Sequence, residues 1–199
     1  MKKKYSLFLI LFVMIILIIF SITYFVNYKT AEEIQELLAQ SEKISNMYVE
    51  HYINYGEYSN NIKDYKVDIF IKDNVYIYDV LDRIDYVNYN TNECYSIKNN
   101  TKISEIPIEQ ANKFNDYSEY FNSQLYIYSY NFPYYINNTW CDKITLKNNS
   151  NNTKTVIYIS KENGLILKIE RISSAKKLVE TFNYQLNVVT DEQIKSFGI

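Results

Sequence analysis

The sequence has 199 residues, and its 21 lysines and arginines against 23 aspartates and glutamates give a formal net charge of −2 at pH 7. Removing Lys2, Lys3 and Lys4 from that charge leaves −5 on the rest of the chain, and a mildly acidic chain without a basic run argues against a nucleic-acid partner. Three glycines are too few to build a glycine-rich phosphate loop, while 22 tyrosines and 10 phenylalanines favour strands.

The segment from Tyr5 to Val26 contains no charged residue, and its small polar residues are only Ser6, Ser21 and Thr23. A helix of this length, at about 1.5 Å per residue, crosses a hydrocarbon core of roughly 30 Å. The apolar core of a cleaved signal peptide is shorter, about 7–15 residues. The sequence therefore predicts a single-pass transmembrane signal-anchor over residues 5–26.

The charges around this segment predict its direction across the cell membrane. The lysines at 2–4 place the N-terminus in the cytoplasm and the remaining chain outside. We therefore expect a cytoplasmic tail over residues 1–4 and an extracytoplasmic domain over residues 27–199. Cleavage is the alternative, but Ser21-Ile22-Thr23 is a poor small-x-small site, and no cysteine near the end of the run offers a lipid anchor.

The clearest soluble helix is predicted from Thr30 to about Ser45. Thr30 and Glu33, three residues apart, form a capping-box pattern at its start. The side chains that helical spacing places on one face are Ile34, Leu37, Leu38, Ser41 and Ile44. This face either packs on the core of the domain or binds a partner.

Short alternating segments separated by Asn- and Asp-rich turns follow this helix and predict an antiparallel meander. The expected strands lie at 47–55, 65–71, 75–80, 84–89 and 94–97. A second helix is predicted from Pro107 to about Phe121, with an apolar face formed by Ile108, Ala111, Phe114 or Asn115, and Tyr117 or Ser118.

Strands resume after the second helix, at 125–132, 140–146, 155–160, 165–170 and 177–189, and a short helical turn is expected at 190–193. Asn163-Gly164 supplies the positive φ angles of a hairpin turn, and we expect Leu165, Leu167 and Ile169 to face the core. The sum is an α+β domain in which one curved antiparallel sheet wraps a helix.

A hairpin over 158–165 is followed by Phe182-Asn183-Tyr184 and by Val188-Val189-Thr190-Asp191-Glu192. Together with the strands at 75–78 and 140–144, this pattern resembles the closing segment of the LolA-like lipoprotein-carrier superfamily. The resemblance implies an open antiparallel β-barrel that wraps one or more helices, with an apolar concave face. Together with the apolar segment 5–26, the expected fold is an N-terminal transmembrane helix followed by this barrel. It implies no catalytic residues and no cofactor.

In size, tethering and composition the chain looks like the membrane-tethered Gram-positive branch of that superfamily, which includes the GerS-type sporulation and germination proteins. One group in this branch supports a cell-wall amidase that modifies the spore cortex. The chain departs from the lipoproteins of the superfamily because it lacks their lipobox cysteine.

The sequence offers little that could carry chemistry. His51 is the single histidine, and one histidine is a weak basis for a metal site or a nucleophile–base pair, so we expect it to be structural. Asp79, Asp82 and Asp85 lack the spacing, the central glycine and the terminal glutamate of an EF-hand calcium loop. We therefore predict a non-enzymatic protein with no metal site and no cofactor.

Cys94 and Cys141 are the two cysteines of the chain. Outside the membrane they could form a disulfide if their strands were neighbours in the sheet. The alternative is a pair of buried thiols that behave as small apolar residues.

The most suggestive surface is aromatic. Alternation places Tyr126, Tyr128 and Tyr130 on one face of a strand, and three further aromatic residues follow, Phe132, Tyr134 and Tyr135. On the concave side of an open sheet these six residues could hold an acyl chain or a partner segment. The alternative is that they belong to an ordinary core.

Two functions are compatible with these observations. The first is a membrane-anchored envelope protein that binds a protein partner such as a peptidoglycan amidase in sporulation or germination. The second is a carrier or sensor of lipid or lipoprotein acyl chains. The two differ in one requirement, because a carrier needs an apolar cavity large enough for a chain.

Overall fold

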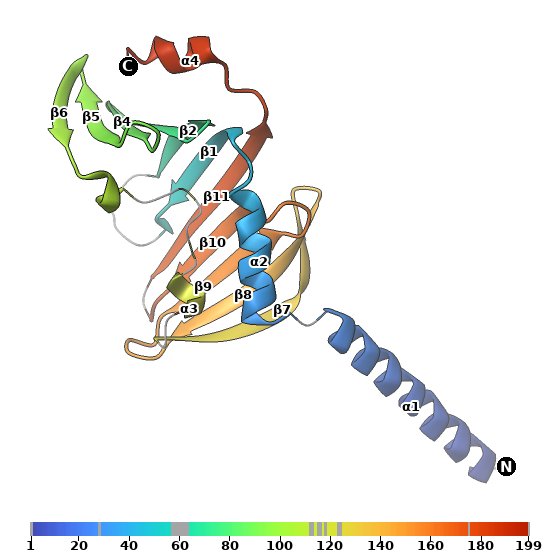
Figure 1. Cartoon of the computed structure of the whole chain (residues 1–199). Helices are drawn as coiled ribbons and strands as arrows, with labels where there is room; N and C mark the ends of the chain where they lie inside the picture. The colour runs from blue at the N-terminus through green and yellow to red at the C-terminus, as the bar shows by residue number, and fades with distance from the viewer. Residues whose placement is uncertain are drawn as a thin grey trace.

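The computed structural model describes residues 2–27, 29–56, 64–111, 114, 117, 119–122, 125–174 and 176–198. The strands form one curved antiparallel sheet, and a helix lies against its concave face (Figure 1). We call the face that contacts this helix the inner face and the opposite one the outer face.

The sheet has 11 strands in the order β6-β5-β4-β3-β2-β1-β11-β10-β9-β8-β7. The strands of its first half are β1 (Asn46–Asn54), β2 (Tyr65–Lys72), β3 (Val75–Val80), β4 (Arg83–Asn88), β5 (Glu93–Lys98) and β6 (Thr101–Glu105). Those of its second half are β7 (Tyr126–Ile136), β8 (Thr139–Asn148), β9 (Lys154–Ser160), β10 (Ile166–Ile172) and β11 (Lys177–Leu186).

The first and the last strand pair with each other in the middle of the sheet, where Val49 lies opposite Tyr184. Each half is therefore a meander that runs outward from this seam, and β6 and β7 form the two edges. The connection from β6 to β7 must pass from one edge to the other. The predicted antiparallel meander and the predicted open sheet are confirmed.

Asparagine supplies most of the turns between these strands. Apart from Asp73 and Leu81, the non-glycine residues with positive φ are all asparagines: Asn74, Asn92, Asn99, Asn100, Asn137, Asn138, Asn152 and Asn187. Asparagine tolerates the left-handed region because its short side chain bonds to the local backbone. This is how a chain with three glycines closes so many tight turns.

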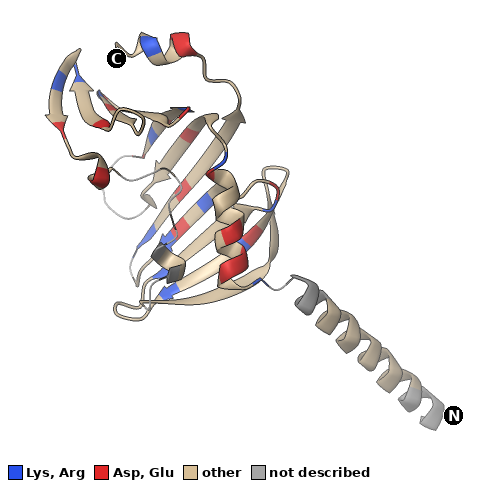
Figure 2. Ribbon diagram, in the orientation of Figure 1, with Lys and Arg blue, Asp and Glu red and all other residues tan. Residues whose placement is uncertain are grey.

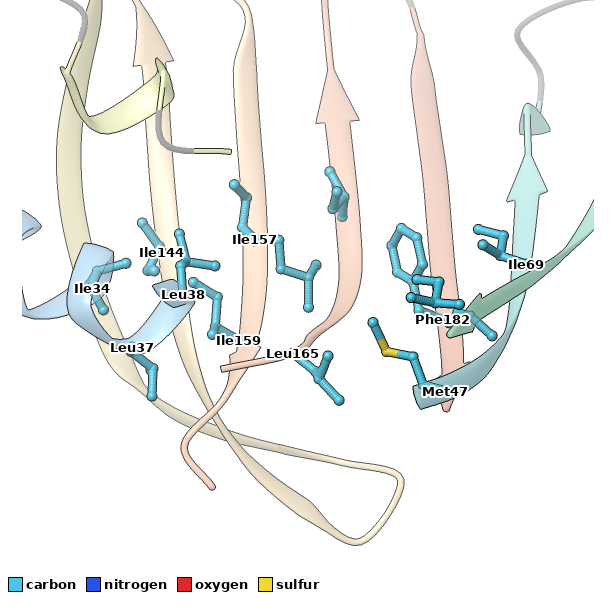
Figure 3. Packing of buried hydrophobic residues seen from close by; sticks show 14 of the residues in the cluster. Ile34, Leu37, Leu38, Met47, Ile69, Ile144, Ile157, Ile159, Leu165 and Phe182 are labelled. Atoms are coloured by element: carbon cyan, nitrogen blue, oxygen red, sulfur yellow. The ribbon is translucent and has the colours of Figure 1, made fainter. Parts of the chain in front are cut away.

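The predicted first helix is confirmed as α2 (Ala31–Ser41), which ends slightly earlier than expected. Thr30 and Glu33 form the predicted capping box, and the buried residues of the helix are Ile34, Leu37, Leu38 and Ser41. Its apolar side packs on strands β8, β9 and β10 of the sheet (Figure 3), while acidic residues lie along the helix (Figure 2). The core-packing reading of this helix is therefore correct.

The predicted helix over 107–121 is wrong as a continuous element. A single 3₁₀ turn, η2 (Ile108–Gln110), ends because Ala111 is extended, and a short α3 (Glu119–Asn122) follows. Asn115 and Ser118, two of the residues offered for its apolar face, lie outside the described residues. The intervening sequence is rich in Asn, Asp and Ser, whose side chains compete with helical backbone bonds.

The N-terminal segment forms α1 (Lys2–Asn27), and its side chains are described from Phe8 to Ile22. The large apolar side chains in that range are 47–74% exposed. Among the described residues, no helix combines the length and the apolarity required to cross a membrane. The prediction of a transmembrane helix over 5–26 is thus not confirmed, although these residues are helical.

The C-terminal helical turn is confirmed as α4 (Asp191–Ser196), which Thr190 and Gln193 cap in the same way as α2. The ring of Phe197 lies 5.0 Å from that of Phe70 on the outer face of the sheet. The last strand is shorter than predicted, because β11 ends at Leu186 and Asn187 turns the chain.

Candidate functional site

A cavity of about 1090 Å³ lies on the inner face of the sheet, beside the part that α2 covers. Its floor comes from β1 to β6, β10 and β11, and its other wall from the connection between β6 and β7. The apolar and aromatic side chains of the floor are Ile53, Tyr65, Val67, Ile69, Tyr78, Val80, Val87 and Phe182. Those of the wall are Ile106, Ile108, Ala111, Phe114, Tyr117 and Tyr120.

The division of the inner face explains why this cavity exists. On the side of β8 to β10, α2 fills the curve of the sheet with Ile34, Leu37 and Leu38. On the side of β1 to β5, the described residues of the connection supply one 3₁₀ turn, the short α3 and a few aromatic rings in place of a long helix. The space between these rings and the sheet is therefore left open.

The cavity is elongated across the strands. Its lining residues run from Ser96 on β5 to Arg171 on β10, which are separated by six steps in the strand order. Since neighbouring strands lie about 4.8 Å apart, the cavity extends roughly 29 Å along the sheet. A long, thin ligand fits this shape.

One end of the cavity carries a buried polar cluster formed by His51, Glu180 and Arg171. The Nε2 of His51 lies 2.9 Å from Oε2 of Glu180, and Arg171 makes an ion pair with the same carboxylate. Burial of the imidazole and the nearby Arg171 guanidinium lower the pKa of His51 to about 4. Neutral His51 therefore donates its Nε2 proton to Glu180, and its ring stacks on Phe182 at 4.3 Å.

The other end carries a second polar cluster. Arg83 Nη2 lies 2.8 Å from Oδ2 of Asp85, and the hydroxyl of Ser96 donates to Oδ1 of the same carboxylate at 2.5 Å. Two tyrosines lie between the two clusters. Burial raises the pKa of the Tyr78 phenol, and it raises the pKa of the Tyr117 phenol to about 12. Both phenols stay neutral, so the middle of the cavity carries no charge from them.

Within the described residues, no group of three His, Cys, Asp or Glu side chains is placed to hold a metal ion. Cys94 lines the cavity, and burial together with Asp85 raises the pKa of its thiol, which disfavours the reactive thiolate. Asp82 pairs with Lys98 on the surface and does not line the cavity, whereas Asp85 does. The arrangement can bind and orient a ligand.

Cys94 and Cys141 are both free and buried. They lie on β5 and β8, which are far apart in the strand order. The disulfide alternative therefore fails, because its geometric requirement was that these strands be neighbours. The alternative of two buried thiols is the one that the structure shows.

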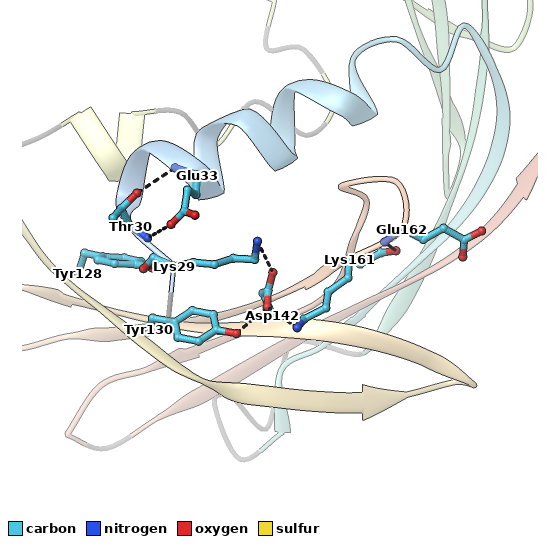
Figure 4. Close-up of polar contacts among 9 residues, drawn as sticks. Lys29, Thr30, Glu33, Tyr128, Tyr130, Asp142, Lys161 and Glu162 are labelled. Carbon is cyan, nitrogen blue, oxygen red and sulfur yellow. Dashed lines mark hydrogen bonds and ion pairs between the residues drawn. The ribbon is translucent and has the colours of Figure 1, made fainter. Parts of the chain in front are cut away.

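The predicted aromatic surface divides into two groups. Tyr126, Tyr128 and Tyr130 do share the inner face, but they pack against the core under α2 and do not line the cavity. The hydroxyl of Tyr128 donates to the carbonyl of Lys29 at 2.8 Å, and that of Tyr130 donates to Asp142 at 2.7 Å (Figure 4).

The other three predicted residues, Phe132, Tyr134 and Tyr135, are 46–54% exposed. A bulge between Asn131 and Tyr134 breaks the alternation of β7, so the face expected from the sequence does not continue past it. None of the three lines the cavity. A contact between these six aromatic residues and a ligand or a partner remains a prediction.

Sequence reasoning missed the residues that line the cavity. They come from eight strands and the connection, and each strand contributes one to three of them. The alternating pattern marked Val67 and Ile69 as facing one side of a strand, which is the only signal that they gave. Such a residue packs in the core if α2 covers its half of the sheet, and it lines the cavity if α2 does not.

No protein-family description matches the chain, and no curated protein matches it either. Among solved structures, that of MucB in complex with MucA(peri) is 10% identical over 82% of this chain and 59% of MucB, with a TM-score of 0.50. MucB alone gives 9% identity over 82% of this chain and 61% of MucB, also at 0.50. The chain thus spans about three-fifths of MucB's length.

A LolA superfamily protein from Nitrosomonas europaea is 11% identical over 83% of this chain and 97% of its own, with a TM-score of 0.33. Identities this low concern the fold alone. LolA superfamily proteins are among the structures that this chain resembles, as the sequence predicted. The narrower resemblance to the GerS-type branch is not confirmed.

Proposed function

We propose that this protein binds a long apolar ligand of the lipid or acyl-chain class in the inner-face cavity, and that it does so without catalysing a reaction. The observation that carries this proposal is the cavity itself, with about 1090 Å³ of space and apolar side chains on both walls, among which polar side chains such as Ser104, Glu109 and Gln110 also lie. Ligand pockets commonly enclose about 300–1,000 Å³ and are mostly apolar, with few polar groups.

The two polar clusters support this choice of ligand. Arg171 with Glu180 and His51 lies at one end, Arg83 with Asp85 and Ser96 at the other, and the neutral side chains of Val67, Ile69 and Tyr78 lie between them. Polar groups of this kind fix the orientation of a ligand whose main contacts are apolar. A chain with a polar head matches such a distribution.

The test is a binding titration of the full chain with cis-parinaric acid, a fatty acid whose fluorescence rises in apolar surroundings. Val80→Phe places a larger side chain in the cavity floor and should weaken binding at least about tenfold. Val188→Phe is the matched control, because Val188 is 42% exposed and does not line the cavity. Wild-type protein that does not bind the probe, or equal binding by both variants, would refute the proposal.

A second candidate is the binding of a protein partner, such as a cell-wall amidase that acts in sporulation or germination. The edge strand β6 supports it, because all five residues are exposed and an extended segment could add to its free edge. MucB was crystallised with a protein, MucA(peri). Capture of the full chain from envelope extract should then recover a peptidoglycan enzyme with both Val80→Phe and wild type, and recovery of lipid alone would contradict it.

We also propose that residues 5–26 tether the domain 27–199 to the outer side of the cell membrane, with residues 1–4 in the cytoplasm. The uncharged segment behind Lys2, Lys3 and Lys4 supports this arrangement. In membrane fractions, the full chain should resist extraction by alkaline carbonate and should lose residues 27–199 to protease added from outside. Release by carbonate would contradict the tether.

A further inference from the structure

Large exposed apolar side chains of the described domain gather along one edge of the sheet. On and beside β7 they are 46–59% exposed, and we call them the β7 patch: Leu125, Ile127, Phe132, Tyr134, Tyr135 and Trp140. Three of them are tyrosine or tryptophan, and the rings of Tyr135 and Trp140 lie 5.1 Å apart. Exposed apolar and aromatic side chains that gather at one edge in this way mark a candidate interaction site.

Position at an edge does not by itself explain this exposure. The opposite edge strand, β6, is equally exposed but consists mainly of polar residues, with Ile103 as its one large apolar side chain. Natural edge strands are usually protected by charged residues, as Lys102 and Glu105 protect β6. On β7 the described residues carry no charge at all.

The β7 patch is continuous with the apolar surface of α1. The ring of Phe20 on α1 lies 6.1 Å from that of Phe132 in the patch. Figure 1 shows α1 leaving the domain beside β7, and residues 8–22 of α1, whose side chains are described, include no charged residue (Figure 2). A membrane or partner that binds the patch would therefore also contact this helix.

Lysines follow the patch on the outer face of the next strands. Ile127 pairs with Lys147, which pairs with Lys154, and Lys143 lies 5.4 Å from the ring centre of Tyr134. None of these three lysines has an acidic group within 4.0 Å among the described residues. Cations behind an aromatic edge complement the anionic headgroups of a bilayer.

We propose that the β7 patch lies in the interfacial layer of an anionic bilayer, with Lys143, Lys147 and Lys154 over the headgroups. This inference rests on the proposed tether at residues 5–26. Tryptophan and tyrosine concentrate at the membrane–water interface, because their rings are apolar and their N–H or O–H groups can stay hydrated. The domain is then docked through one edge of its sheet, not held at a distance by a free tether.

Trp140 is the single tryptophan of the chain and reports on the patch directly. The full chain is reconstituted into vesicles of phosphatidylcholine and phosphatidylglycerol that carry bromine on acyl carbons near the headgroup. We expect strong quenching of Trp140 emission and loss of its access to aqueous iodide. The matched control is the variant Trp140→Phe with Ile103→Trp, which moves the tryptophan to the opposite edge strand, where 53% exposure is similar.

The control variant should show little lipid quenching and full access to iodide. Equal quenching in the two proteins, with both floating with the vesicles, would overturn the docking and leave the tether intact. Protein that does not float with the vesicles would overturn tether and docking together.

Lys143→Glu with Lys147→Glu should shift the ratio of docked to undocked protein about fivefold per lysine, and an unchanged ratio would overturn the role of the headgroups.

Discussion

The buried carboxylate of Asp142 contacts the segment through which the chain enters the domain, just before α2. Its side chain is fully buried, with Oδ1 accepting from Tyr130 and lying 3.4 Å from Lys161 Nζ. Its Oδ2 lies 4.0 Å from Lys29 Nζ, one residue before the cap of α2. Because a buried carboxylate is costly unless it is paired, these contacts hold the start of α2 against the sheet.

Asp142→Asn should lower the free energy of unfolding by about 2 kcal/mol, because it removes the charge that the two lysines and the phenol share. Urea denaturation followed by circular dichroism measures this change. Asp82→Asn is the control, since the Asp82–Lys98 pair is exposed and its loss should change stability little. Equal losses in the two variants would contradict the structural role of Asp142.

His51 should make stability depend on pH. Its folded pKa of about 4 lies below the ordinary value of 6.5, so between these values the unfolded chain binds a proton that the folded chain does not. Its contribution is fully present above pH 6.5 and is lost as the pH falls toward 4, by up to about 3 kcal/mol. His51→Gln should remove this part of the pH dependence, measured by urea denaturation at pH 7 and 4.5, and parallel curves for both proteins would disprove it.

At the scale of elements, the turn between β9 and β10 is built against α2. Gly164 has φ +72°, and a Cβ placed there would lie 1.8 Å from the carbonyl oxygen of Leu37. Its N–H donates to Ser160 at 3.0 Å, which closes the turn. The helix can therefore approach the sheet this closely only because position 164 has no side chain.

Gly164→Ala should destabilise the domain by about 3 kcal/mol, since it combines left-handed strain with a clash against the α2 backbone. Gly198→Ala is a matched control, with φ +74° but nothing within 4 Å of the added Cβ. It should cost about 1 kcal/mol or less. Thermal unfolding of both variants tests this, and a Gly164→Ala protein as stable as the control would contradict the close packing.

The elements that local chemistry specifies could be predicted from the sequence. The capping box fixed the start of α2, and alternation with Asn-rich turns gave the meander. The register shifts in three strand pairs could not be seen, because an inserted residue leaves no mark in an alternating pattern. One bulge, between Ile166 and Lys168, turns Leu167 to the outer face, where it packs against Cys141, Val156 and Tyr158, contrary to the predicted core position.

At the scale of the molecule, the candidate site depends on which half of the sheet each segment covers. The sequence predicted a second helix over 107–121, and a full helix in that segment would have occupied much of the cavity. That segment instead forms a 3₁₀ turn and a short α3. The cavity could not be predicted, because it results from this difference between the two halves and from pairing across the β1–β11 seam.

The same asymmetry assigns different roles to different parts of the domain. The half under α2 holds most of the buried core, including Ile144, Ile157 and Ile159, and gives the domain its stability. The half next to the connection contains the cavity. Some of the side chains that line the cavity, such as Val80 and Tyr65, are partly exposed. The edge at β7 is the one that we propose for docking. Under these proposals, ligand binding, stability and attachment fall on different parts of one sheet.

Native mass spectrometry of the full chain purified from cells is the most direct test of ligand binding in the cavity. We predict a stoichiometric bound lipid or acyl chain in the wild type and in Val188→Phe, and its loss in Val80→Phe. Retention of the lipid by Val80→Phe, or wild-type protein that carries a peptidoglycan enzyme and no lipid, would contradict the account.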